Sequence, residues 1–191
     1  VFNNLRYFGY SWMSALFSEM FGLDPAESSA YLALPEVLGL VFTAAVGPAA
    51  SSLTSGRLSQ TPVLRRMATG WGFGLSAACM CFVPLSASPG TATVWLSVNA
   101  CCLGLHSVGF KANYLDLSNR HAGTMTGLGN TIASLPGFFG PMMAAAALEA
   151  TGGSWLTVCG LVATTNSVGA AVFVRYSCFQ CIDERIDRKV I

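Results

Sequence analysis

The chain has 191 residues, of which 53% are hydrophobic and 10% charged, and its net charge is +1. Its mean hydropathy is +0.55. Because soluble domains carry roughly 25% charged residues, this composition excludes a water-soluble globule. It also excludes a disordered tail, which needs low hydrophobicity and high charge, and a nucleic-acid partner, which needs an excess of cations for phosphates. A membrane protein is the class that fits.

The charged residues divide the chain into apolar segments of the length that a bilayer-spanning helix needs, about 20 residues. No Asp, Glu, Lys or Arg occurs between Arg66 and Lys111, and the turn-like stretch 86–90 divides this interval into two spans. The sequence therefore predicts an all-α polytopic membrane protein with six transmembrane helices and a short tail. The expected spans are 1–21, 28–53, 63–87, 91–112, 122–148 and 154–177, and the tail is 178–191.

Alternate loops differ in charge. The loops 22–27, 88–90 and 149–153 hold no Lys or Arg, whereas 54–66, the turn after the fourth span and the tail are basic. Since Lys and Arg of short loops stay on the cytoplasmic side, we expect the first helix to run outward and the C-terminus to be cytoplasmic.

The sequence opens at Val1 inside an apolar segment, without the charged n-region of a signal peptide. We therefore expect that an upstream part is missing. Six helices that end inside fit the second half of a twelve-helix carrier. By this expectation the 191 residues alone do not catalyse uptake.

Two neighbouring stretches carry a family pattern: 109–123 reads GFKANYLDLSNRHAG, and 127–130 reads GLGN, followed by Gly137 and Pro141. This resembles the anion:cation symporter family of the major facilitator superfamily, the group of sialin, the vesicular glutamate transporters and phosphate transporters. The resemblance covers essentially the whole chain as the C-terminal six-helix half. It implies transport of an organic or inorganic anion, such as phosphate or a small carboxylate, with Na⁺ or H⁺, and no cofactor.

Other segments agree with this resemblance, and three positions depart from it. Residues 2–4, 33–35 and 56–67 resemble the family's seventh helix, the start of its eighth and its basic loop between the eighth and ninth. The departures are Asn119 in place of Pro, Gly129 in place of Ser, and Glu36 in place of an aromatic residue or His.

The fifth span carries small and polar residues at three- and four-residue steps, which places them on one helical face. They are Gly123, Gly127, Asn130, Ser134, Gly137 and Pro141. Such a stripe is either a packing seam for a neighbouring helix or a face of the transport cavity. Asn130 lies about 12 Å into the span at 1.5 Å per residue, where an unpaired amide is costly. The resemblance favours Asn130 as a substrate contact, with Ser134 one turn beyond.

Further substrate contacts are expected on the first and fourth spans. The vesicular glutamate carriers have an Arg near the start of the first span, at the position of Phe2 or Asn3, and Arg6 lies one turn further. A guanidinium binds carboxylate or phosphate bidentately, although Arg6 could instead snorkel to the interface.

On the fourth span, Ser107 and Phe110 match cavity positions of the family, unless Ser107 bonds back to its own helix. His106 points about 100° away, which favours a lipid-interface or interhelix residue.

Three charged residues are candidates for coupling and gating. Glu36 lies about nine residues into the second span, where a carboxyl shielded from water could carry a proton. Asp116 and Arg120 match the family's Asp and Arg at a cytoplasmic turn, which implies a gate, although a solvated turn explains them as well.

The remaining signals are weaker. Five of the seven cysteines fall within spans, where a thiol behaves as a small hydrophobe. Cys178 and Cys181 form a C-x-x-C without a second pair, which is a weak metal signal. No metal-ligand cluster or nucleophile–base pattern favours an enzyme. The alternative to a carrier is a multi-span protein that packs with a partner without transporting.

Overall fold

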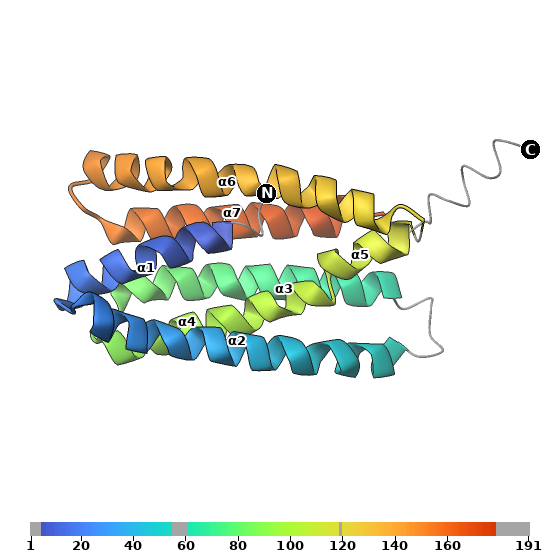
Figure 1. Ribbon diagram of the computed structural model, residues 1–191, viewed down its shortest axis with the longest axis horizontal. Helices are drawn as coiled ribbons and strands as arrows, with labels where there is room; N and C mark the ends of the chain where they lie inside the picture. The colour runs from blue at the N-terminus through green and yellow to red at the C-terminus, as the bar shows by residue number, and fades with distance from the viewer. Residues whose placement is uncertain (1–4, 55–60, 119, 179–191) are drawn as a thin grey trace, which may run out of the picture.

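The computed structural model describes residues 5–54, 61–118 and 120–178, with the side chains of 5–11, 53, 54, 61, 115 and 116 left out of the description. These residues form long helices that run roughly along one axis (Figure 1). The α-helices are α1 (Leu5–Phe21), α2 (Pro25–Thr54), α3 (Thr61–Phe82), α4 (Pro89–Gly104), α5 (Phe110–Leu117), α6 (Ala122–Ala150) and α7 (Trp155–Tyr176). Short 3₁₀ turns, η3 (Val83–Leu85) and η4 (Leu105–Ser107), follow α3 and α4.

The all-α polytopic fold predicted from the sequence is confirmed. Five stretches of the described residues have the length and apolar composition to cross a membrane, namely Pro25–Ser52, Pro62–Leu85, Pro89–Tyr114, Ala122–Ala150 and Trp155–Tyr176. The described part of the first helix, α1, has 17 residues. The fourth span differs from the expectation of one continuous helix, because it consists of α4, η4 and α5 in succession.

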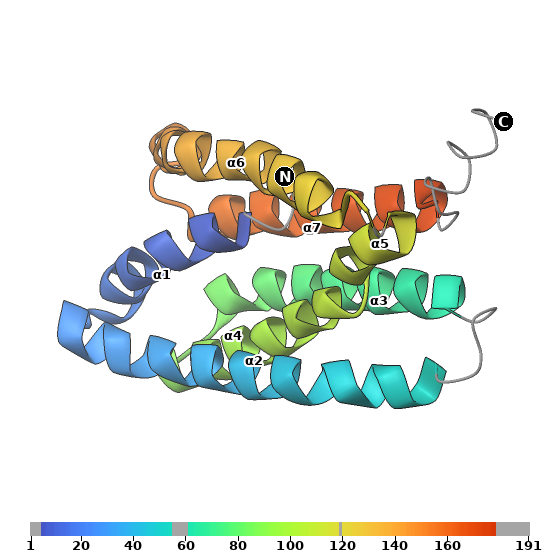
Figure 2. The ribbon, with the colours of Figure 1, turned by 45° about the vertical axis from the view of Figure 1, so that its right-hand side comes forward.

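The helices pack mainly as two pairs, α3 with α7 and α2 with α4, and contacts between α3 and α4 join the pairs. As a result, α2 and α6 lie on opposite sides of the bundle (Figure 2). The largest core cluster joins α1, α3, α4 and α7 through residues such as Phe17, Met80, Leu96 and Val158. Glycines allow the closest approaches. A Cβ on Gly72 of α3 would come within 2.8 Å of the Cys102 carbonyl oxygen of α4.

Local signals in the sequence set several helix ends. Ser88 caps α4 in a capping box with Thr91, and Pro89 occupies the first turn. At the start of α2, the Asp24 and Glu27 carboxylates each accept from the other's backbone N–H, at 2.8 and 3.1 Å. The turn between α6 and α7 uses Gly152 and Gly153 at φ of 65° and 90°, a region that glycine adopts readily.

The ends of the bundle differ in charge. The start of α3, the α5–α6 turn and the end of α7 lie at one end (Figure 1), and Arg65, Arg66, Arg120 and Arg175 belong to these segments. We call this the basic end. Asp24, Glu27 and Glu149 lie at the opposite end, in the α1–α2 and α6–α7 connections.

Candidate functional site

The helix break between α4 and α5 positions the residues of the family motif. Gly104 ends α4 beside α2, where a Cβ would come within 2.8 Å of the Thr43 hydroxyl oxygen. Gly109 precedes α5 and contacts Thr69 of α3 so closely that a side chain there would collide with it. Arg65 of α3 donates from Nη1 to the Val108 carbonyl at 2.7 Å. The break therefore lets α5 start in a new position against α3.

A pocket of about 410 Å³ lies beside α5, toward the basic end. It is lined by α3, α5, α6 and α7. The lining residues are Thr69, Phe73, Phe110, Lys111, Tyr114, Thr126, Gly129, Asn130, Ala133, Gly169, Val172 and Phe173. Its size is within the range of about 300–1,000 Å³ that small-molecule sites occupy.

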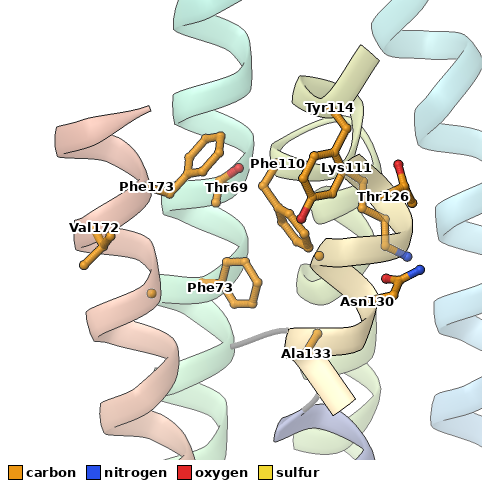
Figure 3. Close-up of a pocket in the computed structure, with 12 residues that line it drawn as sticks. Thr69, Phe73, Phe110, Lys111, Tyr114, Thr126, Asn130, Ala133, Val172 and Phe173 are labelled. Atoms are coloured by element: carbon orange, nitrogen blue, oxygen red, sulfur yellow. The ribbon is translucent and has the colours of Figure 1, made fainter. Parts of the chain in front are cut away.

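The two sides of the pocket differ in polarity. Phe73 of α3 lies on the same side as Val172 and Phe173 of α7, whereas the Lys111 ammonium and the Asn130 amide lie together on the α6 side (Figure 3). Phe110 stands between the two sides, and its ring centroid is 5.9 Å from that of Phe73. The pocket thus has an aromatic wall and a polar wall.

Thr69 lies on the aromatic side of the pocket, but its hydroxyl faces Gly109. The residue is 1% exposed, and its hydroxyl has no hydrogen-bond partner among the described residues. In Figure 3 the hydroxyl points from α3 toward α5. The hydroxyl oxygen packs against the Gly109 backbone and is itself buried, so it is not open to a molecule in the pocket.

Tyr114 of α5 and Gly129 of α6 are in close contact. A Cβ on Gly129 would come within 2.6 Å of the Tyr114 hydroxyl oxygen. Gly129 is one of the positions at which the sequence departs from the family pattern, where Ser is usual. The space above Gly129 is occupied by the Tyr114 side chain, which gives this departure a physical reason.

Two of the predicted substrate contacts, Phe110 and Asn130, line this pocket together. Ser107 does not line it, and its hydroxyl donates to the Gly104 carbonyl at 2.8 Å, which is the back-bonding alternative. Ser134 likewise donates to the carbonyl of Asn130 at 3.0 Å and is exposed on α6. Back-bonding leaves each hydroxyl oxygen able to accept a further hydrogen bond.

Three glycines of the small-residue stripe of α6 face open space in the described part of the chain. A Cβ on Gly123, Gly127 or Gly137 would meet none of the described residues within 4 Å, so no described helix packs on these three positions. Asn130 belongs to this open stripe and also lines the pocket. It therefore lies at the boundary between the two.

The candidate coupling and gating residues lie apart from the pocket. Glu36 is exposed on α2, next to the buried Pro35. Arg120 is exposed in the α5–α6 turn at the basic end. The backbone of Asp116 lies in α5, but its side chain is outside the described residues. The same holds for the Arg6 side chain, and all of Asn3 lies outside.

The structure also places the residues with weaker signals. His106 is buried, and its ring centroid is 5.6 Å from that of Phe110, four residues further along the same span. Cys79, Cys102 and Cys159 are buried free thiols. Cys178 is exposed at the end of the described chain, and Cys181 lies outside it. No group of three or more His, Cys, Asp or Glu able to hold a metal ion occurs within the described residues.

Sequence reasoning missed most of the pocket. Thr69 and Phe73 fall one turn apart on α3, and Val172 and Phe173 belong to an apolar stretch of α7. Nothing in either segment distinguishes them from ordinary core residues. Thr126 was detectable, because it lies one turn before Asn130 on α6.

The apolar spans, the helical bundle and the charge difference between its ends define a polytopic α-helical membrane protein. The chain is 29% identical to vesicular glutamate transporter 1 of Bos taurus over 160 residues, which are 83% of this chain and 28% of the relative. It is 28% identical to vesicular glutamate transporter 2.1 of Danio rerio over 160 residues, 83% of this chain and 27% of the relative. Sialin of Ovis aries is 36% identical over 87 residues, 45% of this chain and 18% of that protein.

The chain is thus a homologue of vesicular glutamate transporters and sialin, in the anion:cation symporter family of the major facilitator superfamily, as its motifs predicted. No protein-family model matches the chain. The matched part spans less than a third of the length of these relatives.

Proposed function

We propose that the chain is part of a secondary active transporter that moves an organic or inorganic anion together with Na⁺ or H⁺ by alternating access. The observation that carries this proposal is the position of Asn130. It lines a pocket with a polar wall and belongs to an α6 face that no other described part of the chain covers. The names of its homologues, vesicular glutamate transporters and sialin, support the anionic class of substrate.

The open stripe of α6 supports a second element of the proposal. Small residues at Gly123, Gly127 and Gly137 leave the helix backbone accessible, and in carriers built from repeats the substrate binds between the halves near the midplane. We propose that this stripe faces a further six-helix half of the complete protein. The substrate path then runs along α6, past Asn130 and Ser134.

The proposed substrate contacts supply donors that an anion needs. The Asn130 amide donates through its NH₂ group and the Lys111 ammonium offers a positive charge beside it. Ser107 and Phe110 flank the break before α5. Asn3 and the Arg6 guanidinium are proposed to complete the site from α1. An ionised substrate inside the membrane is stable only when such groups replace its hydration.

Charged residues are proposed to set the orientation of the protein in the membrane, to bind the coupling cation and to form a gate. Arg65, Arg66, Arg120 and Arg175 at the basic end favour a cytoplasmic location of that end, because short basic loops are retained there. Glu36 is proposed to carry the coupling cation. Asp116 and Arg120 are proposed to act as a gate at the basic end.

The test is uptake by the complete protein in proteoliposomes. Asn130→Ala is expected to lower kcat/KM for the transported anion about tenfold or more, since it removes a hydrogen bond to a charged ligand. Thr131→Ala is the matched control, because Thr131 is exposed on the same turn and its hydroxyl donates to the Gly127 carbonyl at 3.0 Å. Equal uptake by both variants and the unmodified protein would remove Asn130 from the path, and absence of saturable anion uptake by the unmodified protein would refute the function.

A further inference from the structure

We infer that Arg65 is a positioning residue for transport, which keeps the fourth span broken before α5 by bonding the carbonyl oxygen of Val108. Two donors compete for this carbonyl, the Arg65 guanidinium and the backbone N–H of Ala112. The inference rests on the proposed function in one respect, that Phe110, the first residue of α5, contacts the transported anion. It goes beyond that function by naming a residue that acts without touching the anion.

The backbone of Val108 and Gly109 departs from helical geometry. Val108 has φ −92° and ψ −10°, and Gly109 has φ −89° and ψ −114°, whereas ψ in a regular helix is about −42°. In an uninterrupted helix the Val108 carbonyl would accept the N–H of Ala112, four residues further on. No backbone bond of the described chain joins these two groups, and the bond at the start of α5 runs from the Asn113 N–H to the Gly109 carbonyl at 3.3 Å. The break therefore frees the Val108 carbonyl for another donor.

Arg65 of α3 supplies that donor. Its Nη1 lies 2.7 Å from the Val108 carbonyl oxygen, and the contact is partly buried. A hydrogen bond from a charged donor is roughly twice as strong as one between neutral groups, so the guanidinium is a better partner for this carbonyl than the Ala112 N–H. Leaving that N–H without a backbone partner costs little, because the first N–H groups of any helix lack one.

The break sets the position of the residues that follow it. Gly109 packs closely on Thr69 of α3, and α5 turns from the line of α4 toward α6 (Figure 2). Phe110 then stands between the two sides of the pocket (Figure 3). For the Ala112 N–H to bond the Val108 carbonyl, ψ of Gly109 would have to change from −114° to about −42°. That rotation would move Phe110 from its present place.

The neighbouring Arg66 separates the effect of position from the effect of charge. It carries the same charge at the same end of the bundle, and its guanidinium bonds the hydroxyl and the carbonyl of Ser177 at 3.2 and 3.0 Å. Both arginines satisfy the rule that basic residues of short loops stay on the cytoplasmic side, whereas the bond to Val108 belongs to Arg65. A role in orientation or net charge alone therefore predicts equal effects of removing either cation.

Amide hydrogen exchange of the complete protein in nanodiscs tests the competition, with overlapping peptides across η4 and α5 to report the Ala112 amide. Arg65→Met removes the competing donor, so the Ala112 N–H should bond Val108 and exchange about tenfold more slowly. A merely structural role of Arg65 predicts the opposite, faster exchange. Arg65→Lys, which keeps a charged donor, should restore most of the original rate, and Arg66→Met should leave it unchanged. Unchanged or faster exchange at Ala112 in Arg65→Met would overturn the inference.

Ala112→Pro gives an independent test, because proline has no N–H with which to bond the Val108 carbonyl. The first turn of a helix tolerates proline, so α5 is retained. In proteoliposomes, Arg65→Met should raise KM for the transported anion about fivefold or more and change kcat less, since it displaces Phe110. Adding Ala112→Pro to Arg65→Met blocks the continuous helix and should lower KM again. A double variant as impaired as Arg65→Met would overturn the inference, as would Ala112→Pro alone raising KM equally.

Exchange and uptake together separate this inference from the proposed function. Saturable anion uptake with the same KM in the unmodified protein, Arg65→Met and Arg66→Met refutes the inference alone. If the unmodified protein shows no saturable uptake of any anion while the Ala112 amide follows the expected pattern, the transport function is refuted and control of the break by Arg65 is supported.

Discussion

The hydroxyl of Tyr114 lies over the Cα of Gly129, so that a Cβ on Gly129 would come within 2.6 Å of that oxygen. Both residues line the pocket. The two positions therefore constrain each other, since a side chain at 129 would force the hydroxyl end of Tyr114 to move.

Gly129→Ser, which restores the residue usual in the family, is accordingly expected to impair this chain. The Tyr114 ring must move, which narrows the pocket and costs about 1–3 kcal/mol, as overpacking does. Tyr114→Phe removes the nearest oxygen and leaves Cζ at 3.2 Å, so the double variant should recover part of the loss. Thermal unfolding of the complete protein in nanodiscs measures this. Additive effects of the two changes would show that the contact does not limit the site.

The sequence predicted most of this fold because the bilayer imposes a simple rule, that long uncharged segments form spanning helices. The break at the fourth span was not predicted. The segment 91–110 carries no Asp, Glu, Lys or Arg, whereas its helix is interrupted by close contacts of Gly104 with α2 and of Gly109 with Thr69. Such contacts join residues far apart in the sequence, and no local pattern reports them.

The sequence predicted site residues only where a polar residue lies inside an apolar span or where a residue belongs to the family motif. Asn130 is a polar residue deep in a span, and Phe110 belongs to the family motif, and both line the pocket. Phe73 and Phe173 look like any buried aromatic residues in the sequence. Ser107 and Ser134 were equally conspicuous in the sequence. Their hydroxyls donate to backbone carbonyls three and four residues earlier, and whether a serine does so depends on the groups packed around it.

The Arg65 guanidinium is expected to hold the helix break in place. Its Nη1 donates to the Val108 carbonyl at 2.7 Å, in the segment where the regular helix is interrupted. Arg65→Ala should lower the free energy of unfolding by about 1.5–3 kcal/mol, as loss of a charged hydrogen bond does. Arg66→Ala is the matched control, because Arg66 bonds exposed groups of Ser177 and should cost less. An Arg65→Ala variant as stable as Arg66→Ala would contradict this role.

A buried polar network joins α3, α4 and α7. The Ser76 hydroxyl donates to Asn99 Oδ1 at 2.6 Å and accepts from Asn166 Nδ2 at 2.9 Å. All three side chains are buried. Asn166→Leu should destabilise the bundle by about 1–2 kcal/mol, the upper range for interhelical hydrogen bonds in membranes.

Ser97→Ala is the comparison for that network. Ser97 is buried too, but its hydroxyl donates to the Thr93 carbonyl of its own helix at 2.7 Å. Its removal should therefore leave interhelix packing unchanged. Denaturation of the reconstituted protein in a graded detergent series measures both variants, and equal losses would mean that the network adds nothing beyond side-chain burial.

Glu36 is the residue with which the coupling proposal can be tested most directly. It is an exposed carboxylate on α2, eleven positions after the start of that helix at Pro25. Glu36→Gln keeps the shape and removes the ability to bind and release a proton. In the complete protein we expect this variant to lose uptake driven by a pH gradient while retaining exchange of labelled anion across the membrane at equal pH. Glu149→Gln, in an exposed position at the end of α6, should leave both activities unchanged. Unaltered gradient-driven uptake by Glu36→Gln at every pH would exclude Glu36 as the proton carrier, and the coupling cation would then have to bind elsewhere.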